Sequence, residues 1–278
     1  MSDYDAVVLG GGAAGLMFAL TAGQRGKRVL VLECTNKFGK KILMSGGGRC
    51  NFTNLEIQAD HFLSQNPHFV KSAIARYTQW DFIDMVERHG IAYREKSHGQ
   101  LFCDDSAKQI VRMLLKECDE AGVTCRLQVD VHGVEQLAEG YRVEWAGEMG
   151  GVSVTCANLI VATGGLSIPT LGGATGLGYR LAQQFDLPLV DRAASLVPLT
   201  LSGQLLEFSK ALTGISLGLA VRTKQREFVL DLLFTHRGLS GPAILQISNY
   251  WALSDVLEID LVPAMSDTAL HDCLLARK

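Results

Sequence analysis

Three glycines near the N-terminus have the spacing that binds the phosphates of a dinucleotide. Gly10, Gly12 and Gly15 form the pattern G-x-G-x-x-G directly after the apolar run 6–9, which predicts a strand. In this pattern the first glycine permits a tight turn, the second lets backbone approach a pyrophosphate, and the third lets a helix pack close to the strand. The following residues predict a helix to about Gln24, whose N-terminal N–H groups attract phosphate.

An acid follows the next apolar run. Residues 28–32 predict a second strand, and Glu33 comes directly after it. Glu33 lies close to the ~20 residues from Gly10 at which an acid typically binds a ribose hydroxyl. A carboxylate at this place repels a 2′-phosphate, which argues against NADP in this site. A glycine turn also occurs in α/β proteins that bind no nucleotide, but the strand, helix and acid together favour dinucleotide binding.

A basic, glycine-rich loop is expected after Glu33. Residues 34–55 include no acid, and the consecutive glycines 46–48 leave backbone N–H groups free to face a ligand, between Ser45 and Arg49. Glycine nests and basic side chains suit a diphosphate. The alternative is a solvated loop in which these glycines only provide flexibility. The basic residues of the loop are Lys37, Lys40, Lys41 and Arg49.

The composition is that of an ordinary globular protein. The 278 residues allow one large domain or two smaller ones, and 47% of them are apolar and 20% charged. The net charge of −3 gives no reason to expect nucleic acid or an anionic membrane as a partner. No apolar run approaches the ~18 residues of a membrane span, and the N-terminal residues do not form a secretory signal.

The cysteines and histidines predict no disulfide framework and no metal site. The seven cysteines are odd in number and form no C-x-x-C pair, which suits a reduced compartment. The histidines are scattered without the spacing of metal ligands. We therefore expect a cytoplasmic protein, and its oligomeric state is left open.

The remaining pattern predicts an α/β fold followed by a β-rich part. Helices are expected within 66–90 and from 105 or 106 to 121, with a hairpin over 91–102 between them. Strands are expected at 123–127, 129–137, 141–145, 151–156 and 158–163. A glycine turn at 169–178 precedes a helix to about Phe185, and short alternating runs begin at 191.

Two of these segments resemble a known family. GGGAAGLM, beginning at Gly10, and GKKILMSGGGRCNFTN, beginning at Gly39, are similar to segments of the bacterial BaiN-like (aminoacetone oxidase-type) NAD(P)/FAD-dependent flavoproteins. These proteins are relatives of the glutathione-reductase-type FAD folds. The resemblance implies an FAD-dependent oxidoreductase that transfers hydride through the flavin to or from a small organic substrate, with NAD(P)H as a transient reductant.

The resemblance also implies which residues bind the cofactor. The ADP half of FAD would be held by Gly10, Gly12, Ala14, Gly15 and Glu33. Its pyrophosphate and flavin would lie along Lys41, Ser45, Gly46, Gly47, Arg49 and Asn51. Backbone of Val131 would lie against adenine, although a generic strand explains this segment equally well. The turn Thr163, Gly164, Gly165 would return the chain to the cofactor, although a core strand with a glycine turn is the alternative.

The same resemblance divides the chain. Residues 1–190 would form a Rossmann-like FAD-binding domain with a parallel sheet and a β-meander, and residues 191–278 a partial inserted domain that contacts substrate. The segment 234–242 resembles the FTH-x-GLSGP signature of the inserted domain, in which His236 is either an acid or base or a turn residue. The family continues with a C-terminal segment that holds part of the flavin, and we expect this segment to be missing here.

Two other functions remain open. The glycine motif also fits a simple NAD dehydrogenase, which leaves the second glycine segment unexplained. The chain also fits a non-catalytic, cofactor-binding remnant of the family. No nucleophile triad, carboxylate pair or metal cluster in the sequence favours a different mechanism.

Overall fold

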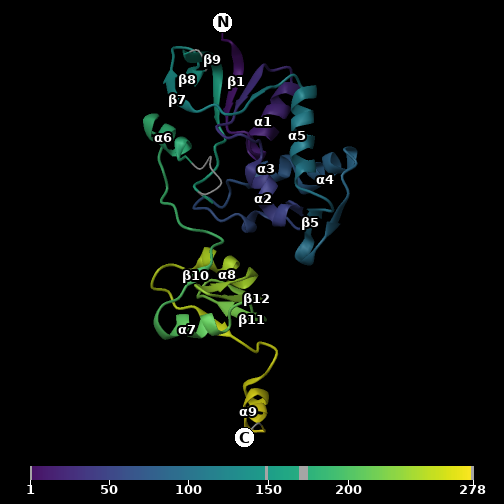
Figure 1. Cartoon of the computed structure of the whole chain (residues 1–278), viewed down its shortest axis with the longest axis vertical. Helices are drawn as coiled ribbons and strands as arrows, with labels where there is room; N and C mark the ends of the chain where they lie inside the picture. The colour runs from purple at the N-terminus through teal and green to yellow at the C-terminus, as the bar shows by residue number, and fades with distance from the viewer. Residues whose placement is uncertain (1, 148–149, 169–174, 277–278) are drawn as a thin grey trace. The chain divides into compact units, whose positions relative to one another are not determined.

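The computed structural model describes residues 2–147, 150–168 and 175–276. The chain divides into two compact units, Met1–Leu189 and Val190–Lys278 (Figure 1). The first is an α/β unit built on a six-stranded sheet, and the second is built on a five-stranded antiparallel sheet. The predicted fold class, a Rossmann-like domain with a parallel sheet and β-meander followed by a β-rich part, is confirmed.

The central strand of the first unit is the apolar run that precedes the glycine motif. β1 (Tyr4–Leu9) pairs in parallel with β2 (Val29–Leu32) on one side and with β9 (Gly150–Val161) on the other. The sheet continues to β6 (Thr124–Arg126) beyond β2, and to β8 (Tyr141–Gly147) and β7 (Val131–Gln136) beyond β9. β8 and β7 are antiparallel and form the expected meander.

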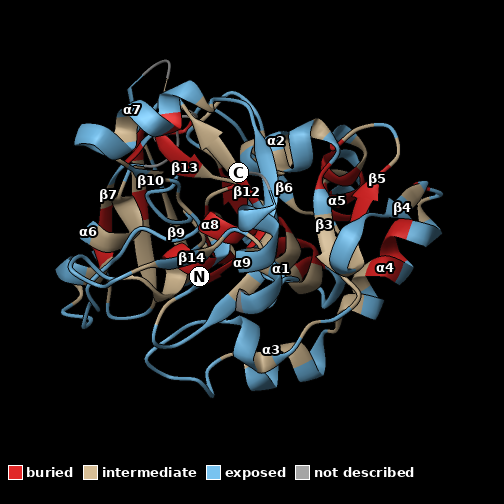
Figure 2. Ribbon diagram, turned by 90° about the horizontal axis from the view of Figure 1, so that it is seen from below, coloured by how far each residue is buried: buried red, intermediate tan, exposed pale blue. Residues whose placement is uncertain are grey.

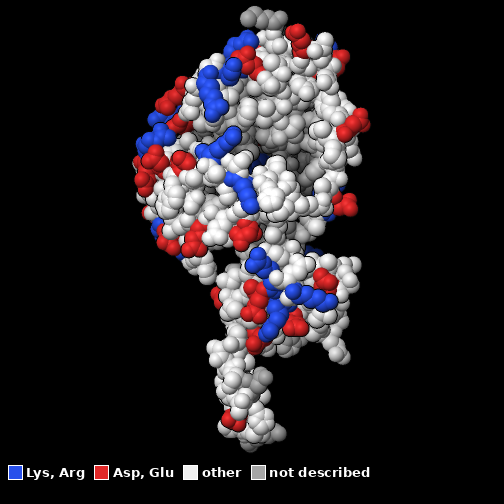
Figure 3. All heavy atoms as spheres, turned by 180° about the vertical axis from the view of Figure 1, so that it is seen from behind, with Lys and Arg blue, Asp and Glu red and all other residues white. Residues whose placement is uncertain are grey.

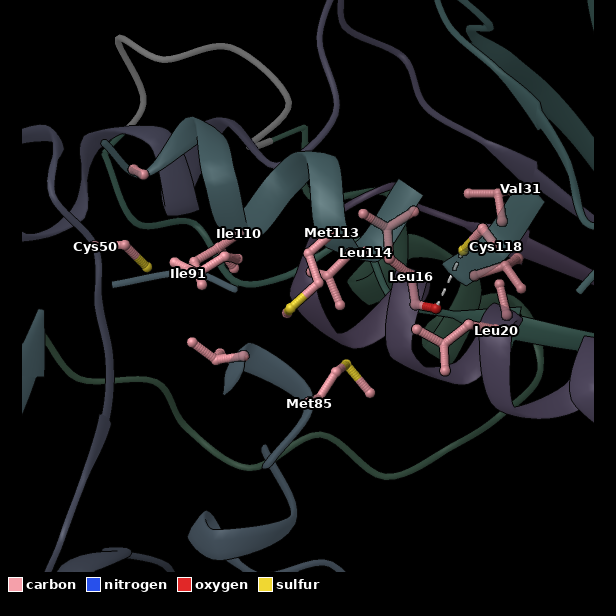
Figure 4. Close-up of a cluster of buried hydrophobic side chains, with 14 of the residues drawn as sticks. Leu16, Leu20, Val31, Cys50, Met85, Ile91, Ile110, Met113, Leu114 and Cys118 are labelled. Carbon is pink, nitrogen blue, oxygen red and sulfur yellow. Dashed lines mark hydrogen bonds between the residues drawn. The ribbon is translucent and has the colours of Figure 1, made fainter. Parts of the chain in front are cut away.

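Side chains of β1 and β2 alternate between two cores because the strands are covered on both faces. Ala6 and Val8 pack with α1 (Ala13–Gln24) and α5 (Lys108–Glu120), where Leu16, Leu20, Leu114 and Cys118 meet (Figure 4). Val7 and Leu9 pack instead with residues of the meander. This double burial holds the glycine turn at the end of β1 in a fixed place.

The first unit is completed by short elements around α2 (Lys40–Gly48). A three-stranded antiparallel sheet contains β3 (Asn51–Asn54), β4 (Tyr93–Glu95) and β5 (Gln100–Cys103). The other elements are η1 (Ala59–His61), α3 (Lys71–Arg76), α4 (Gln79–Arg88), η2 (Ser97–Gly99) and α6 (Leu177–Gln184). Figure 2 shows buried residues on α4 and β5, beside exposed outer faces.

Two expectations about this unit were wrong in detail. The strands expected at 151–156 and 158–163 are one strand, β9, because Cys156 pairs with Tyr141 of β8 and with Tyr4 of β1 at the same position. The loop expected after Glu33 contains α2, because residues 40–44 are good helix formers. The glycines still interrupt that helix, since Ser45, Gly46 and Gly47 have non-helical backbone angles.

The second unit packs one helix onto its sheet. The strand order is β10-β13-β12-β11-β14. Ile244 and Ile247 of α8 (Pro242–Ile247) are fully buried against Leu219 of β11 and Leu232 of β12. The strands are β10 (Leu199–Thr200), β11 (Ser216–Arg222), β12 (Glu227–Thr235), β13 (Gly238–Ser240) and β14 (Glu258–Asp260). The other elements are α7 (Gly203–Ala211), η4 (Ser248–Tyr250) and α9 (Asp267–Leu275).

Among the described residues, none of the helices combines the length and the hydropathy needed to span a membrane. All seven cysteines are free thiols. The described residues contain no group of three or more His, Cys, Asp or Glu side chains that could hold a metal ion.

Candidate cofactor site

The turn between β1 and α1 needs glycine at two positions for packing reasons. Gly10 has φ +108°, and a Cβ there would lie 2.5 Å from the carbonyl oxygen of Ala162. A Cβ at Gly15 would lie 1.9 Å from the carbonyl oxygen of Gly10. Both distances are far below van der Waals contact, so a side chain at either position would push α1 or β9 away from the turn.

Gly12 differs from these two glycines because open space lies above it. A Cβ at Gly12 would meet no atom within 4 Å. Gly12 is also the N-cap of α1, and no described side chain caps this helix end. Backbone N–H groups of the first turn, in Ala13 and Ala14, therefore face the free space. This is the geometry that binds phosphate through a helix dipole and unpaired donors.

Glu33 is held at the end of β2 by backbone donors. Its Oε2 accepts a hydrogen bond of 2.8 Å from the N–H of Gly11, and its Oε1 accepts one of 2.9 Å from the N–H of Thr35. The side chain is half-buried and lines the same cleft as Gly12. Because a carboxylate can accept about four hydrogen bonds, lone pairs remain for the hydroxyls of a ribose.

These residues lie in one cleft of about 250 Å³. Figure 3 shows the larger unit hollowed on one face, with Lys and Arg side chains beside the hollow. Eight residues predicted as cofactor-binding line this cleft: Gly10, Gly12, Ala14, Glu33, Lys41, Val131, Thr163 and Gly164. They come from segments more than 150 residues apart, which the β1–β9 pairing brings together.

The two sides of the cleft carry opposite charges. Glu33 and Asp130 lie on the side where the N–H of Val129 donates to the carbonyl of Glu33 at 3.0 Å. Lys41 and Arg180 lie on the side of the turn that follows β9. The acidic side suits hydroxyl and amine donors of a nucleoside, and the basic side suits phosphate.

The basic side is fixed by contacts to backbone and hydroxyl groups. Lys41 Nζ lies 2.7 Å from Ser167 Oγ and 3.3 Å from the carbonyl oxygen of Gly165. Arg180 Nη1 donates to the carbonyl oxygen of Thr175 at 2.6 Å. Within the described part of the chain neither cation is paired with a carboxylate. Their charge is therefore available to a ligand in the cleft.

The other predicted residues lie outside the lining of this cleft. Ser45 Oγ donates to the carbonyl of Ile42 at 2.9 Å, and Arg49 Nη1 donates to the carbonyl of Asp104 at 2.6 Å. A Cβ at Gly46 would meet the ring of Phe102 at 2.5 Å. Gly15 packs beneath the turn. The predicted flavin contacts of Ser45, Gly46, Gly47, Arg49, Asn51 and Gly165 stay predictions.

The sequence reading did not assign several residues that line the cleft. Arg180 is the most informative of them, because it is basic and lies one turn into α6, after the glycine turn. Part of that turn, 169–174, lies outside the described residues. The lining residues without a predicted role are Leu9, Ala13, Leu32, Cys34, Thr35, Gly39, Lys40, Ile42, Val129, Asp130, Ala162, Thr175, Leu177 and Arg180.

Cys34 is not activated as a nucleophile. Its Sγ lies 3.7 Å from Glu33 Oε1. Burial, and then the neighbouring carboxylate, raise the pKa of the Cys34 thiol above its usual value. Since the thiolate is the reactive form, this cysteine remains an unreactive thiol at neutral pH.

The signature in the second unit forms a hairpin between β12 and β13. Thr235 Oγ1 donates to the carbonyl of Gly238 at 2.8 Å, and the fully buried Ser209 Oγ lies 3.0 Å from that same carbonyl oxygen. Gly238 has φ +141°, and a Cβ there would lie 2.3 Å from the carbonyl oxygen of Leu199. These contacts explain the glycine and the threonine structurally. His236 is exposed in the turn, and its role as an acid or base stays a hypothesis.

Solved structures are similar to the chain only at low identity. THI4 from Thermovibrio ammonificans is 16% identical with a TM-score of 0.42, over 87% of this chain and 78% of that one. A 3-ketosteroid-delta4-(5alpha)-dehydrogenase from Rhodococcus jostii is 15% identical with a TM-score of 0.46, over 60% of this chain and 47% of that one.

Similarity in sequence is much closer. Two proteins named ribosomal RNA dihydrouridine synthase, from Escherichia coli and Haemophilus influenzae, are 51% and 52% identical over 95% of this chain. The chain spans 65% and 66% of their lengths. A 3-dehydro-bile acid delta(4,6)-reductase from Clostridium scindens is 26% identical over 88% of this chain and 60% of its own length.

The family assignment comes from the match of residues 4–236 to the description "HI0933-like protein Rossmann domain". The matched range contains the whole cofactor cleft and extends to the hairpin of the second unit. The chain belongs to the HI0933-like family of FAD-dependent Rossmann proteins.

Proposed function

We propose that the chain is the FAD-binding part of an oxidoreductase that reduces the uracil ring of a uridine in ribosomal RNA. The observation that carries this proposal is the 51–52% identity, over 95% of the chain, to two proteins named for that reaction. Dihydrouridine differs from uridine by two hydrogens across the C5–C6 bond, which is conjugated with a carbonyl. Because the chain spans about two thirds of those relatives, the activity of the whole protein belongs to the proposal.

The cleft fits FAD. Open space above Gly12 and the uncapped first turn of α1 accept the diphosphate, and Lys41 and Arg180 supply positive charge. Glu33 accepts the ribose hydroxyls of the ADP half. When bound, FAD supplies the hydride-transfer chemistry, while the protein provides position and electrostatics.

The electrons and protons of the proposed reaction balance as follows. A nicotinamide cofactor, NAD(P)H, provides two electrons and a proton as hydride, and this hydride reaches one carbon of the uracil double bond by way of FAD. A proton from water completes the other carbon, so that the ring is saturated and NAD(P)⁺ is released. The cleft residues named above bind and orient the cofactor during this exchange.

A small organic substrate is the second candidate. The relative named 3-dehydro-bile acid delta(4,6)-reductase, at 26% identity, supports the BaiN-like resemblance and a small conjugated ketone as substrate. Both candidates reduce a carbon–carbon double bond next to a carbonyl, so they differ in substrate and not in reaction. The first departs from the expectation of no nucleic-acid partner, which rested on the net charge alone.

A complementation experiment tests the first candidate. The chain would be expressed in Escherichia coli from which the related gene has been deleted, and dihydrouridine in ribosomal RNA would be measured by mass spectrometry. We expect the modification to return, with the relative from Escherichia coli as positive control. A chain that purifies with FAD and restores no dihydrouridine, but reduces a conjugated ketone, would support the second candidate.

Cofactor choice is tested separately. Thermal shift with FAD, NAD and no ligand should show the largest rise in melting temperature with FAD. A larger rise with NAD would favour the simple dehydrogenase. A chain that binds neither cofactor would match the non-catalytic remnant.

A further inference from the structure

Exposed aromatic side chains gather in residues 61–80 of the first unit, a segment that contributes nothing to the lining of the cleft. Phe62, Phe69, Tyr77 and Trp80 are 44%, 79%, 42% and 57% exposed. These four residues, with the cationic side chains that alternate with them, are called here the aromatic segment.

Local structure keeps three of these aromatics close together. The N–H of Lys71 donates to the carbonyl of His68 at 3.2 Å, so the chain turns from Phe69 directly into α3. Tyr77 is the C-cap of α3, and Thr78 is the N-cap of α4. A six-residue helix is about 9 Å long, so the segment from Phe69 to Trp80 is compact.

Trp80 is not needed for the core of the first unit. Ile83 and Val86 of α4 are buried in that core. Trp80 lies on the helix face of Asp84 and Glu87, which are one and two turns further along and are exposed. A large aromatic on a solvent face is unfavourable by itself and marks an interaction surface when others accompany it.

The charges around these aromatics are positive although the chain is acidic overall. Lys71 and Arg76 lie at the two ends of α3, and their side chains have no hydrogen-bond or ion-pair partner among the described residues. Asp60 is the one acid in 57–80, and its carboxylate lies 3.9 Å from the imidazole of His61. Aromatic faces beside unpaired cations are typical of single-stranded nucleic-acid binding, in which bases stack and phosphates pair with cations.

We propose that the aromatic segment binds the single-stranded RNA that flanks the reduced uridine. This rests on the proposed function. Phe69 and Trp80 offer faces for stacking of unpaired bases, and Lys71 and Arg76 contact the phosphates between them. A second copy of the chain is the less suitable occupant, because lysine is depleted where proteins bury aromatics against each other.

The test uses the FAD-loaded 278-residue chain and a fluorescent single-stranded RNA of about 12 nucleotides, within the site size of such surfaces. Binding is measured by fluorescence anisotropy for Phe69→Leu, Trp80→Leu and the double variant. The matched control is Phe208→Leu, which changes a residue of the second unit that is 59% exposed. We expect the double variant to weaken binding about 10- to 100-fold and the control to leave it unchanged.

The cations provide a second measurement. Lys71→Ala and Arg76→Ala should each lower the slope of log affinity against log salt by about 0.7, the value for one phosphate contact on a single strand. The control is Lys108→Ala, because Lys108 is exposed at the start of α5. Equal slopes in all these proteins would overturn the proposal.

Other outcomes are distinguishable from failure of the proposed function. If the aromatic variants alter the oligomeric state seen by light scattering and leave RNA affinity unchanged, the segment binds a second copy and the proposal is wrong. FAD content and the reduction of free uridine are measured on the same proteins. Loss of RNA affinity with normal FAD content supports the proposal, whether or not uridine is reduced. Variants that unfold are replaced by Phe69→Tyr and Trp80→Phe, for which weaker binding is again required.

Discussion

The two glycine segments of the first unit look alike in sequence and serve different surroundings. In the turn after β1, Gly12 has free space above it and the first N–H groups of α1 face a cleft. In the kink of α2, a Cβ at Gly46 would meet the ring of Phe102. Arg49, next to this kink, donates to a carbonyl of its own chain. The comparison teaches that a glycine pattern indicates unusual backbone, while the neighbours decide whether a ligand or the protein itself uses it.

The largest expected effect is at Gly15. Gly15→Ala places a methyl group 1.9 Å from a carbonyl oxygen of the first turn, so we expect a loss of about 3 kcal/mol in the free energy of unfolding, the upper range for overpacking. Urea denaturation measures this loss. The matched variant Gly12→Ala should keep full stability and bind FAD more weakly, because its methyl group enters the free space. A Gly12→Ala protein that unfolds as readily as Gly15→Ala would erase the difference between packing and ligand glycines.

The next effect concerns Glu33. Glu33→Ala should weaken FAD binding by ~1–3 kcal/mol, the scale of hydrogen bonds to a charged group. Isothermal titration with FAD measures the change, and Glu33→Gln should retain part of the affinity because its amide oxygen still accepts. Unchanged affinity in Glu33→Ala would place the ribose elsewhere.

A smaller effect separates the cations of the two segments. Arg180→Ala removes a charge from the cleft and should lower FAD affinity about tenfold, with little change for riboflavin, which has no diphosphate. Arg49→Ala is expected to lower FAD affinity less than Arg180→Ala does, at an unchanged melting temperature of the apo protein. If it lowers that melting temperature and leaves FAD affinity alone, the kink of α2 is structural.

The smallest effect is a pH dependence in the second segment. Burial raises the pKa of Cys103 to about 11, and Cys103 donates its N–H to the carbonyl of Arg49. Because the folded-state pKa lies above the unfolded value, the contribution of this thiol is complete below about pH 9. It is lost as the pH rises toward 11. Urea denaturation at pH 8 and pH 10 should show a smaller decrease for Cys103→Ala than for the unchanged chain. Cys273→Ala, which changes an exposed thiol, should behave like the unchanged chain, and equal decreases in all three would contradict the assignment.

The sequence was most informative where the chemistry is local. The strand, turn, helix and acid from Tyr4 to Glu33 are neighbours in the chain, and their spacing alone predicted the cleft floor. Arg180 was missed because its approach depends on how α6 packs, which no spacing in the sequence records. β9 was divided in two because its partners change from β8 to β1 halfway along, and each half resembles an independent short strand.

The shared position of Cys156 in β9 has a consequence for how the protein is made. Asp3 and Thr155, beside the β1–β9 pair, bond to each other 152 residues apart. At ordinary rates of synthesis, β1 therefore waits roughly 8–30 s on the ribosome before its partner strand emerges. During that interval one edge of the most apolar strand of the unit is unpaired, which exposes it to pairing with other nascent chains. The Rossmann sheet closes only when more than half of these 278 residues have been translated.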